Sequence, residues 1–239
     1  MSADCQLIAM VPARMGSKRV PLKNLRYING RPLVGQAVSL ALEAGIFQDI
    51  WINSEAEILA VMAEEYGVKF HRRPDHLAGD KATNREFTLE FLEKHECDYV
   101  VIVNPTSPAL RPGTIVDFGR RLARGDLDTL LTVVDEQAEM FYRGRPLNFD
   151  PARKINSQHL PVVRKVVWAL SGWRRAAFLD LAGRGENPIF GGRMELFALA
   201  QDEACDIDTE ADWRLAEAAL KSRAEPGPVR YYPDRERLK

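Results

Sequence analysis

Short apolar runs alternate with longer amphipathic stretches along most of this 239-residue chain, and that alternation limits the possible folds more than any single motif does. The runs are rich in Val, Ile and Leu, which is typical of buried strands. They cover residues 7–11, 49–53, 68–70, 98–103 and 128–134. Because the runs are continuously apolar, we expect a sheet that is covered on both faces and is therefore parallel.

The stretches between the runs carry helix signals. Ser54 with Glu57 and Thr83 with Glu86 have the spacing of a capping box, and Pro112 suits the first turn of a helix. Helices are expected over 31–44, from 54 to about 67, from 83 to about 94, from 111 onward, and from 209 to about 221. Strand and helix in alternation predict an α/β fold with a doubly wound, mostly parallel sheet.

Residues 138–165 interrupt this alternation, and their Arg-Gly-Arg-Pro sequence at 143–146 indicates a hairpin or an arm. We interpret the segment as an excursion from the sheet, either a lid or an oligomerisation arm. The chain is accordingly expected to form one domain over residues 1–222, with 138–165 inserted in it. The charged, proline-containing tail 223–239 is expected to lie on the surface or to fray.

Composition argues against several kinds of partner. Lys and Arg total 33 against 34 Asp and Glu, a net charge of -1, so no global basic field exists to hold nucleic acid or an anionic membrane. No apolar run approaches the ~20 residues of a membrane span, and the first residues lack the basic start of a signal peptide. The cysteines Cys5, Cys97 and Cys205 are widely spaced, which argues against a disulfide framework or a metal-binding pair and suits a cytoplasmic protein.

The loop after the first run is the most informative segment for function. Within ten residues it carries four cations: Arg14, Lys18, Arg19 and Lys23. In an open α/β sheet, ligands bind beyond the carboxyl ends of the strands, where these charges could neutralise a polyphosphate. Gly16 would let backbone N–H groups turn toward phosphate oxygens. The loop has neither the dinucleotide-binding nor the P-loop glycine pattern, and composition alone equally allows a solvated basic turn.

Two further segments could contact the same ligand. Asp206 and Asp208 are two residues apart, so in an extended segment both carboxylates lie on one side, a spacing that suits Mg²⁺ bridged to a nucleotide phosphate. The alternative is a solvated loop in which Asp208 or Thr209 caps the next helix. Polar residues at 104–108 follow the strongest run and could contact a ligand, or could form only a rigid proline turn.

The remaining candidate residues favour structural roles. The four histidines have no spacing typical of a zinc site and are expected to be solvated or to cap helices. Trp51, Phe87 and Phe91 are expected to pack in the core.

Four segments, in family order between about residues 6 and 220, resemble motifs of the CMP-N-acetylneuraminate synthetase family, the acylneuraminate and nonulosonic acid cytidylyltransferases. They are VPARMGSKRVPLKNL (11–25), FHRRPDHLAGDKATN (70–84), NPTSPALR (104–111) and CDIDTEADW (205–213). The resemblance implies a three-layer fold of the nucleotide-diphospho-sugar transferase type with a small dimerisation arm. It also implies that CTP and a 2-keto-3-deoxy sugar acid react, with Mg²⁺, to give a CMP-sugar and pyrophosphate.

By motif position, the resemblance gives roles to the charged residues. Arg14, Lys18 and Lys23 would face the triphosphate as catalytic cations. Asp206 and Asp208 would hold the metal, and Asp208 would also count among the catalytic residues.

Other positions would bind the nucleotide and the sugar. Asn24 would lie beside these cations as part of the nucleotide site, and Arg73, Ala82 and Asn84 fall where the family holds cytosine and ribose. Asn104 falls where the family usually has glutamine near the sugar, one methylene longer. Arg164 could match the arginine that binds the sugar carboxylate. The family's RxNGAIY sequence is replaced here by residues 162–173, VVRKVVWALSGW, so its asparagine is missing.

The resemblance implies CTP and a nonulosonic acid as substrates and a homodimer in which the arm completes the sugar pocket of the second subunit. The alternatives are a CMP-Kdo-type cytidylyltransferase, a glycosyltransferase using Asp-x-Asp, and a catalytically silent nucleotide-binding homologue. The glycosyltransferase gives no reason for the cationic loop. A silent site gives no physical reason to keep both the cations and the carboxylates.

Overall fold

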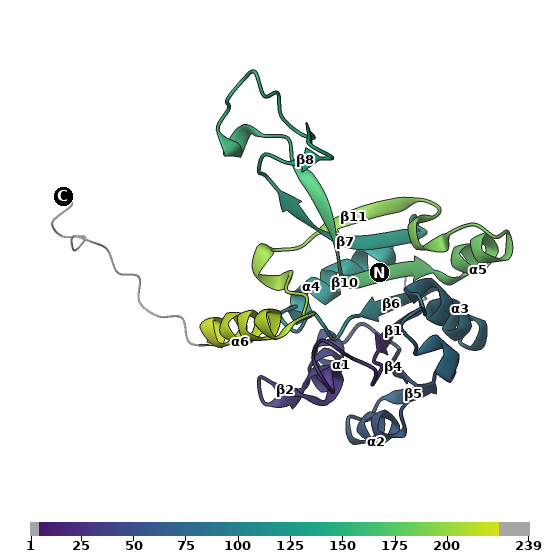
Figure 1. Ribbon diagram of the computed structural model, residues 1–239. Helices are drawn as coiled ribbons and strands as arrows, with labels where there is room; N and C mark the ends of the chain where they lie inside the picture. The colour runs from purple at the N-terminus through teal and green to yellow at the C-terminus, as the bar shows by residue number, and fades with distance from the viewer. Residues whose placement is uncertain (1–4, 225–239) are drawn as a thin grey trace.

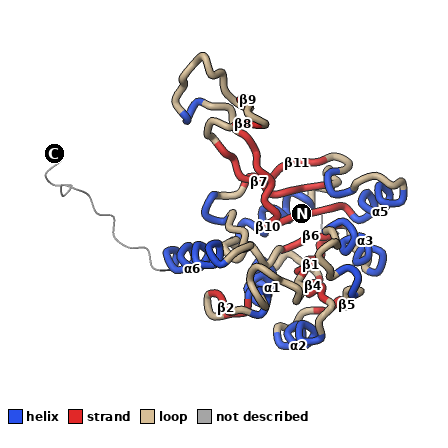
Figure 2. Tube along the Cα trace, viewed as in Figure 1, coloured by secondary structure: helices blue, strands red, loops and turns tan. Residues whose placement is uncertain are grey.

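The computed structural model describes residues 5–224, and one seven-stranded sheet forms its centre (Figures 1 and 2). The strand order is β11-β7-β10-β6-β1-β4-β5. The strands are β1 (Leu7–Pro12), β4 (Asp49–Ser54), β5 (Lys69–Arg72), β6 (Tyr99–Val103), β7 (Thr129–Glu136), β10 (Val163–Arg174) and β11 (Met194–Ala198). All five expected strands are present, and β10 and β11 are additional.

The sheet is mostly parallel, as predicted, and β10 is the exception. It pairs antiparallel with both β6 and β7, whereas the other neighbouring pairs are parallel. β10 can reverse direction because it follows the excursion at 138–165, which returns the chain to the sheet from the end at which β7 left it.

Helices cover both faces of the sheet. α1 (Leu33–Ala44), α2 (Glu57–Glu65) and α4 (Pro112–Leu122) pack on one face, and α3 (Asn84–Lys94) and α5 (Arg175–Gly183) pack on the other. The side chains of β1 alternate between these two cores: Ala9 lies in the first and Met10 in the second, both fully buried. The predicted three-layer α/β architecture is therefore confirmed.

The two expected capping boxes have different outcomes. At the start of α3, the Glu86 N–H donates to Thr83 Oγ1 at 3.3 Å and the Thr83 N–H donates to the Glu86 carboxylate at 2.7 Å, as predicted. The capping box predicted at Ser54 and Glu57 does not form. Ser54 is still the last residue of β4, and its hydroxyl accepts from the Ala56 N–H at 3.2 Å, so α2 begins only at Glu57.

The last described helix, α6 (Glu210–Ala224), begins where expected and extends beyond the expected end near residue 221. Arg223 and Ala224, assigned above to the tail, are helical. The rest of the predicted tail, 225–239, lies outside the described residues.

The segment 138–165, which we call the arm, leaves the sheet at the outer ends of β7 and β10 (Figure 1). It contains the predicted hairpin, made of β8 (Phe141–Tyr142) and β9 (Arg145–Pro146). Arg143 and Gly144 form its two-residue turn with φ angles of 50° and 76°, and positive φ at both positions matches the right-handed twist of the strands. A second small ladder joins β2 (Tyr27–Ile28) to β3 (Arg31–Pro32).

Within residues 5–224, no helix combines the length and the apolar character needed to cross a bilayer. All three cysteines are free thiols, as expected. Burial raises the pKa of the Cys97 thiol to about 12.

Two histidines form a partly buried cluster on the α3 side of β5. His71, which was expected to be solvated or to cap a helix, is instead 5% exposed. Its Nδ1 lies 2.9 Å from His95 Nε2, and its Nε2 lies 2.7 Å from the Glu90 carboxylate. His95 follows the last residue of α3 and caps the helix through its backbone N–H, which donates to the Phe91 carbonyl at 3.1 Å, while its side chain lies in the cluster. Burial lowers the pKa of His71, and burial together with the charge of His71 lowers the pKa of His95 to about 4.

This cluster predicts a loss of stability in acid. Because both pKa values lie below the ordinary value of 6.5, the folded state binds fewer protons than the unfolded state once the pH falls below that value. The two neutral histidines therefore contribute their full free energy to folding above pH 6.5, and this contribution is lost as the pH falls toward 4. We expect calorimetry to show a Tm about 3 °C or more lower at pH 5 than at pH 7. His95→Gln should flatten this dependence, and an unchanged slope in that variant would contradict the assignment.

Candidate functional site

A cavity of about 430 Å³ opens at the carboxyl edge of the sheet, where parallel strands bring distant segments together. Its walls come from the loops that follow β1, β5 and β6, from α3, and from the segment before α6. The lining residues are Pro12, Arg14, Ser17, Lys18, Arg19, Lys23, Asn24, Arg73, Asp80, Phe87, Asn104, Pro105, Thr106 and Asp208.

The cationic loop after β1 is held from three sides. The Ala13 N–H donates to the Asn53 carbonyl at 3.0 Å, the Met15 N–H donates to the Glu55 carboxylate at 2.8 Å, and Asn24 Nδ2 donates to the Arg14 carbonyl at 2.8 Å. These bonds fix the backbone from which Arg14 enters the cavity. Asn24 lies beside the cations as expected, and its amide group supports the loop.

Two bends shape this loop. At Gly16, the Ser17 N–H donates to the Met15 carbonyl at 2.9 Å, which closes a tight turn around the glycine. Gly16 does not have a positive φ, and a side chain at this position would meet no atom within 4 Å, so the turn does not depend on the conformational freedom of glycine. The residue with left-handed backbone is Leu22, whose φ is 51°, an uncommon conformation for a branched side chain.

The cations of the loop converge with acidic residues from distant parts of the chain. Arg14 Nη1 lies 2.9 Å from the Asp80 carboxylate, which Lys18 also contacts. Arg19 lies 2.8 Å from the Asp208 carboxylate, and Lys23 Nζ lies 3.9 Å from it. The predicted juxtaposition of early cations with Asp208 in one cavity is therefore present in the structure.

Lys23 is the most enclosed of these cations. Its side chain is 15% exposed, and its Nζ donates to the Ile207 carbonyl at 2.8 Å. Burial lowers the pKa of Lys23, and the carboxylates of Asp208 and Asp206 oppose that shift. Lys23 thus links the cationic loop to the acidic segment before α6.

Arg73 forms the other buried wall and is 3% exposed. Its Nε donates to Asn53 Oδ1 at 2.6 Å and its Nη2 to the Asn53 carbonyl at 2.9 Å, while the guanidinium lies 4.4 Å from the centre of the Phe87 ring. Burial lowers its pKa to about 10, so it remains a cation at neutral pH. One side of the cavity therefore combines a fixed charge with an aromatic face.

Phe87 adds to the sequence prediction. It was expected in the core with Trp51 and Phe91, and it packs against the core cluster around Phe91 while also lining the cavity. Phe91, one helical turn later, is fully buried and packs edge-on against Trp51 at 6.1 Å. Spacing along α3 places both rings on one side of the helix, but it does not show that a cavity opens beside the first turn.

Sequence reasoning gave no individual role to four other lining residues, although the loops carrying Arg19 and Thr106 were expected to contact a ligand. Asp80 and Thr106 lie inside segments 70–84 and 104–111, so the resemblance could have indicated them. Arg19 and Ser17 were noted only as part of the cationic loop. The contact of Asp80 with two cations depends on tertiary structure and has no signal in the local sequence.

Four sequence-predicted residues do not line the cavity. Asn84 is the first residue of α3 and Ala82 precedes it by two positions. Asp206 is exposed beside the cavity, where its charge still acts on Lys23. Arg164 pairs with Asp135 at 3.3 Å across β10 and β7, at the base of the arm, and its side chain is about half exposed. The structure does not bring Arg164 into the cavity because Arg164 belongs to the ladder that continues into the arm.

Burial alternates along the segment carrying the two aspartates, as expected from their spacing. Ile207 is fully buried between them, and its N–H donates to the Thr106 carbonyl at 2.9 Å. Asp206 and Asp208 therefore both lie on the side away from the core. Across residues 5–224, no group of three or more His, Cys, Asp or Glu side chains gathers closely enough to hold a metal ion by itself.

Comparison with known proteins agrees with this geometry. The model of the family described as "Cytidylyltransferase" matches residues 8–156. N-acylneuraminate cytidylyltransferase A of Danio rerio is 26% identical over 222 residues, which cover 87% of this chain and 49% of that protein. The post-translational flagellin modification protein B of Campylobacter coli is 23% identical, with 91% of this chain and 96% of that protein covered. The chain spans about half the length of the curated acylneuraminate relatives it matches.

Solved structures show the same fold. A CMP:2-keto-3-deoxy-manno-octonic acid synthetase complexed with CTP superposes with a TM-score of 0.70 at 17% identity, covering 91% of this chain and 99% of that one. The 4-diphosphocytidyl-2C-methyl-D-erythritol synthase of Anaerococcus prevotii gives 0.68 at 12% identity, with 91% and 99% covered. With the family model matching more than half of its length, this chain belongs to the cytidylyltransferase family.

Proposed function

We propose that this protein transfers CMP from CTP to the anomeric hydroxyl of a sialic-acid-like 2-keto-3-deoxy sugar acid, a nonulosonic acid, and releases pyrophosphate. The observation that carries the proposal is that Arg14, Lys18 and Lys23 line one cavity together with Asp208, whose carboxylate lies 3.9 Å from Lys23 Nζ. The family supports CTP as the donor, and the names of the relatives in Danio rerio and Streptococcus agalactiae support the acceptor.

The reaction needs position and charge more than a protein nucleophile. The acceptor oxygen attacks the α-phosphorus, and the bond from that phosphorus to the pyrophosphate oxygen breaks. Arg14 and Lys18 bind the phosphates that leave, and Lys23 binds the triphosphate from the more buried side. Their charges stabilise the negative charge that grows on pyrophosphate in the transition state.

Arg73 and Phe87 form the side of the cavity proposed for the cytidine. Asn53 accepts two N–H bonds from the guanidinium, which fixes its plane. No residue within 5–224 accepts a hydrogen bond from Arg73 Nη1, which leaves that group for acceptor atoms of the nucleotide. Ala82 and Asn84 keep their proposed ribose and base contacts on the resemblance alone.

Mg²⁺ is the proposed cofactor, and Asp206 and Asp208 are its proposed ligands. The donor set fits because Mg²⁺ is commonly held by one or two carboxylates together with substrate phosphates, and the described residues offer no larger all-protein cage. When bound, Mg²⁺ would polarise phosphate oxygens and lower the pKa of an attacking hydroxyl. Arg19 and Lys23 hold the Asp208 carboxylate at the cavity wall, and the phosphates would compete for these two cations.

The acceptor side is proposed from Asn104 and Arg164. Asn104 lines the cavity, and its side chain is one methylene shorter than the family's glutamine, which leaves more room near the acceptor. Arg164 would serve a sugar carboxylate only if the base of the arm closes toward a cavity of the same or a second subunit.

We propose a homodimer that forms through the arm. The arm exposes large apolar side chains in a small area: Phe141 is 64%, Tyr142 63% and Leu147 55% exposed. An apolar patch of this kind on a projecting element is typical of an interface between proteins.

Light scattering tests the homodimer. The unmodified protein should have twice the chain mass, and Phe141→Asp combined with Tyr142→Asp should give a monomer with an unchanged circular dichroism spectrum. Leu215→Asp is the matched control, because Leu215 is 67% exposed on α6 and lies outside the arm, and it should remain dimeric. A fully active monomer of the unmodified protein would end the proposal.

A CMP-Kdo-type enzyme is the second candidate, and the fold shared with the synthetase structure above favours it. A catalytically silent homologue is the third. Pyrophosphate release measured with CTP, Mg²⁺ and a panel of nonulosonic acids plus Kdo separates the three. We expect release with at least one nonulosonic acid. Release with Kdo alone would favour the second candidate, and CTP binding without release on any acid would favour the third.

A further inference from the structure

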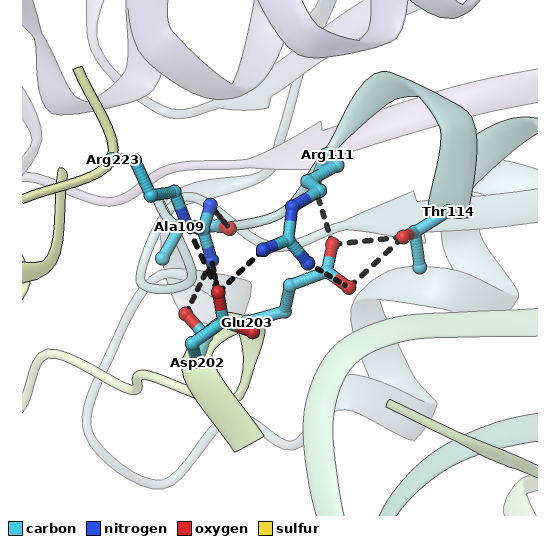
Figure 3. Close-up of polar contacts among 6 residues, drawn as sticks. All are labelled: Ala109, Arg111, Thr114, Asp202, Glu203 and Arg223. Carbon is cyan, nitrogen blue, oxygen red and sulfur yellow. Dashed lines mark hydrogen bonds and ion pairs between the residues drawn. The ribbon is translucent and has the colours of Figure 1, made fainter. Parts of the chain in front are cut away.

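A buried carboxylate outside the cavity joins two of its walls. Glu203 ends the 3₁₀ turn Gln201–Glu203 and is 3% exposed (Figure 3). It accepts from the Arg111 N–H at 2.7 Å and from the Thr114 hydroxyl at 2.8 and 3.0 Å, at the first turn of α4. A carboxylate at this position satisfies an otherwise unpaired N–H and complements the positive end of the helix.

Arg111 extends this contact into a clamp, a name we use for Arg111, Asp202, Glu203 and Arg223. Its Nη1 lies 3.1 Å from the Glu203 carboxylate, and its Nη2 contacts Asp202. Arg223, on α6, lies 3.1 Å from Asp202 and also donates to the Ala109 carbonyl (Figure 3). The clamp therefore ties α4, the 3₁₀ turn and α6 together.

Two cavity-lining segments leave directly from the clamp. Residues 104–106 precede Arg111 by a few positions, and Asp208 follows Glu203 by five. At the far end of these segments, the Ile207 N–H donates to the Thr106 carbonyl at 2.9 Å, and the Ile207 carbonyl accepts from Lys23 at 2.8 Å. The clamp at one end and the Ile207 bonds at the other thus fix how far Asp208 lies from the loop after β6.

The apolar packing of α4 and α6 does not depend on the clamp. Ile115 and Phe118 anchor α4 in the main core, and Trp213 anchors α6 in a separate cluster, all three fully buried. The clamp also holds the short segments that precede the two helices, residues 104–111 before α4 and 204–209 before α6, and these segments reach the cavity.

We propose that Glu203, through Arg111, is a positioning residue that sets the distance between the Asp208 carboxylate and the loop carrying Asn104 and Thr106. The inference rests on the proposed function, because that function makes Asp208 a metal ligand and places the acceptor near Asn104. CTP is held mainly by the loop after β1 and by Arg73, which the clamp does not touch. Loss of the clamp should therefore affect turnover far more than CTP binding.

The test compares Glu203→Gln with a matched control. We expect kcat to fall about 10-fold or more, because displacements near 1 Å can cost up to about 10²-fold. We also expect the KM for CTP to stay within about twofold and the Mg²⁺ concentration for half-maximal rate to rise. The control is Glu195→Gln. Glu195 also holds α4, through Arg121 at 2.6 and 2.8 Å, but it lies on β11 and does not line the cavity. The Glu195→Gln variant should have a lower thermal stability and an unchanged kcat.

Two gentler variants cover the case in which Glu203→Gln does not fold. Arg111→Lys keeps a cation for Glu203 and should retain most of kcat, whereas Asp202→Asn removes one exposed partner and should lower kcat less than Glu203→Gln does. Equal kcat in Glu203→Gln and Glu195→Gln would overturn the proposal. If Glu203→Gln is unfolded, an unchanged kcat in Asp202→Asn would overturn it, with Arg111→Lys as the variant that should keep most of kcat.

A readout independent of turnover separates this inference from the proposed function. Hydrogen exchange at the Ile207 amide should accelerate about 10-fold or more in Glu203→Gln and stay unchanged in Glu195→Gln. If the unmodified protein releases no pyrophosphate on any sugar acid, the proposed function fails, and the exchange rate at Ile207 then tests the positioning role without any activity measurement. Unchanged exchange at Ile207 would overturn the positioning role whatever the substrate proves to be.

Discussion

Asp208→Asn is expected to lower kcat about 10²–10³-fold, the loss typical of removing one charged contact to a transition state. Asparagine keeps the size of the side chain but removes the charge that faces Lys23 and Arg19. The proposed metal loses an anionic ligand at the same time. Initial rates of pyrophosphate release at saturating CTP and Mg²⁺ measure the effect, and excess Mg²⁺ should recover only part of it.

Glu210→Gln is the control for that experiment. Glu210 is a half-exposed carboxylate two residues away that pairs with Arg26 at 2.7 Å, and it does not line the cavity. Its replacement removes one negative charge from the same region and should leave kcat within about twofold of the unmodified value. If Asp208→Asn matched this control, Asp208 would have no part in the reaction.

Lys18→Ala is expected to cost a similar factor of about 10²–10³ in kcat, with little effect on thermal stability. The Lys18 side chain is 79% exposed, and its one described ion pair is with Asp80, so folding depends little on it. The loss should appear mainly in kcat, because the negative charge on the leaving pyrophosphate grows in the transition state. Steady-state rates together with a thermal melt separate the two effects.

Lys81→Ala is the matched control for Lys18→Ala. Lys81 adjoins Asp80, is exposed, and does not line the cavity, so its loss changes the net charge by the same amount. Its kcat should be close to that of the unmodified protein. Equal loss in both variants would show that the effect arises from general charge and that Lys18 makes no specific contact.

The elements that sequence predicted well are those governed by local patterns. β1 and β6 are continuously apolar because both of their faces are covered, and Thr83 with Glu86 forms a box because both partners lie within one turn. The loop after β1 was predicted to lie at the ligand site because ligands of open α/β sheets bind beyond the carboxyl ends of the strands. These inferences needed no knowledge of which segments lie side by side.

The features that sequence missed depend on which segments meet in space. The antiparallel direction of β10 follows from the path of the arm, which no residue pattern within 163–174 encodes. Phe87 and Phe91 share one side of α3, yet only one lies at a cavity. The Asp80 contacts with Arg14 and Lys18 join residues more than sixty positions apart.

The clamp illustrates the same limit. Glu203 is an ordinary acidic residue in the sequence, and nothing near it indicates a buried carboxylate that caps a helix ninety residues earlier. Its proposed effect on Asp208 depends on a hydrogen bond between Ile207 and Thr106 that joins two of the four family-like segments. The resemblance identified both segments without showing how they are held together.

A crystal structure with CTP and Mg²⁺ bound tests the central claim most directly. The account predicts that the triphosphate lies in the cavity, with Arg14, Lys18 and Lys23 on its oxygens, and that Asp208 coordinates a divalent ion which also touches a phosphate. Density for CTP at the opposite edge of the sheet, or in this cavity with its phosphates turned away from Asp208, would contradict it.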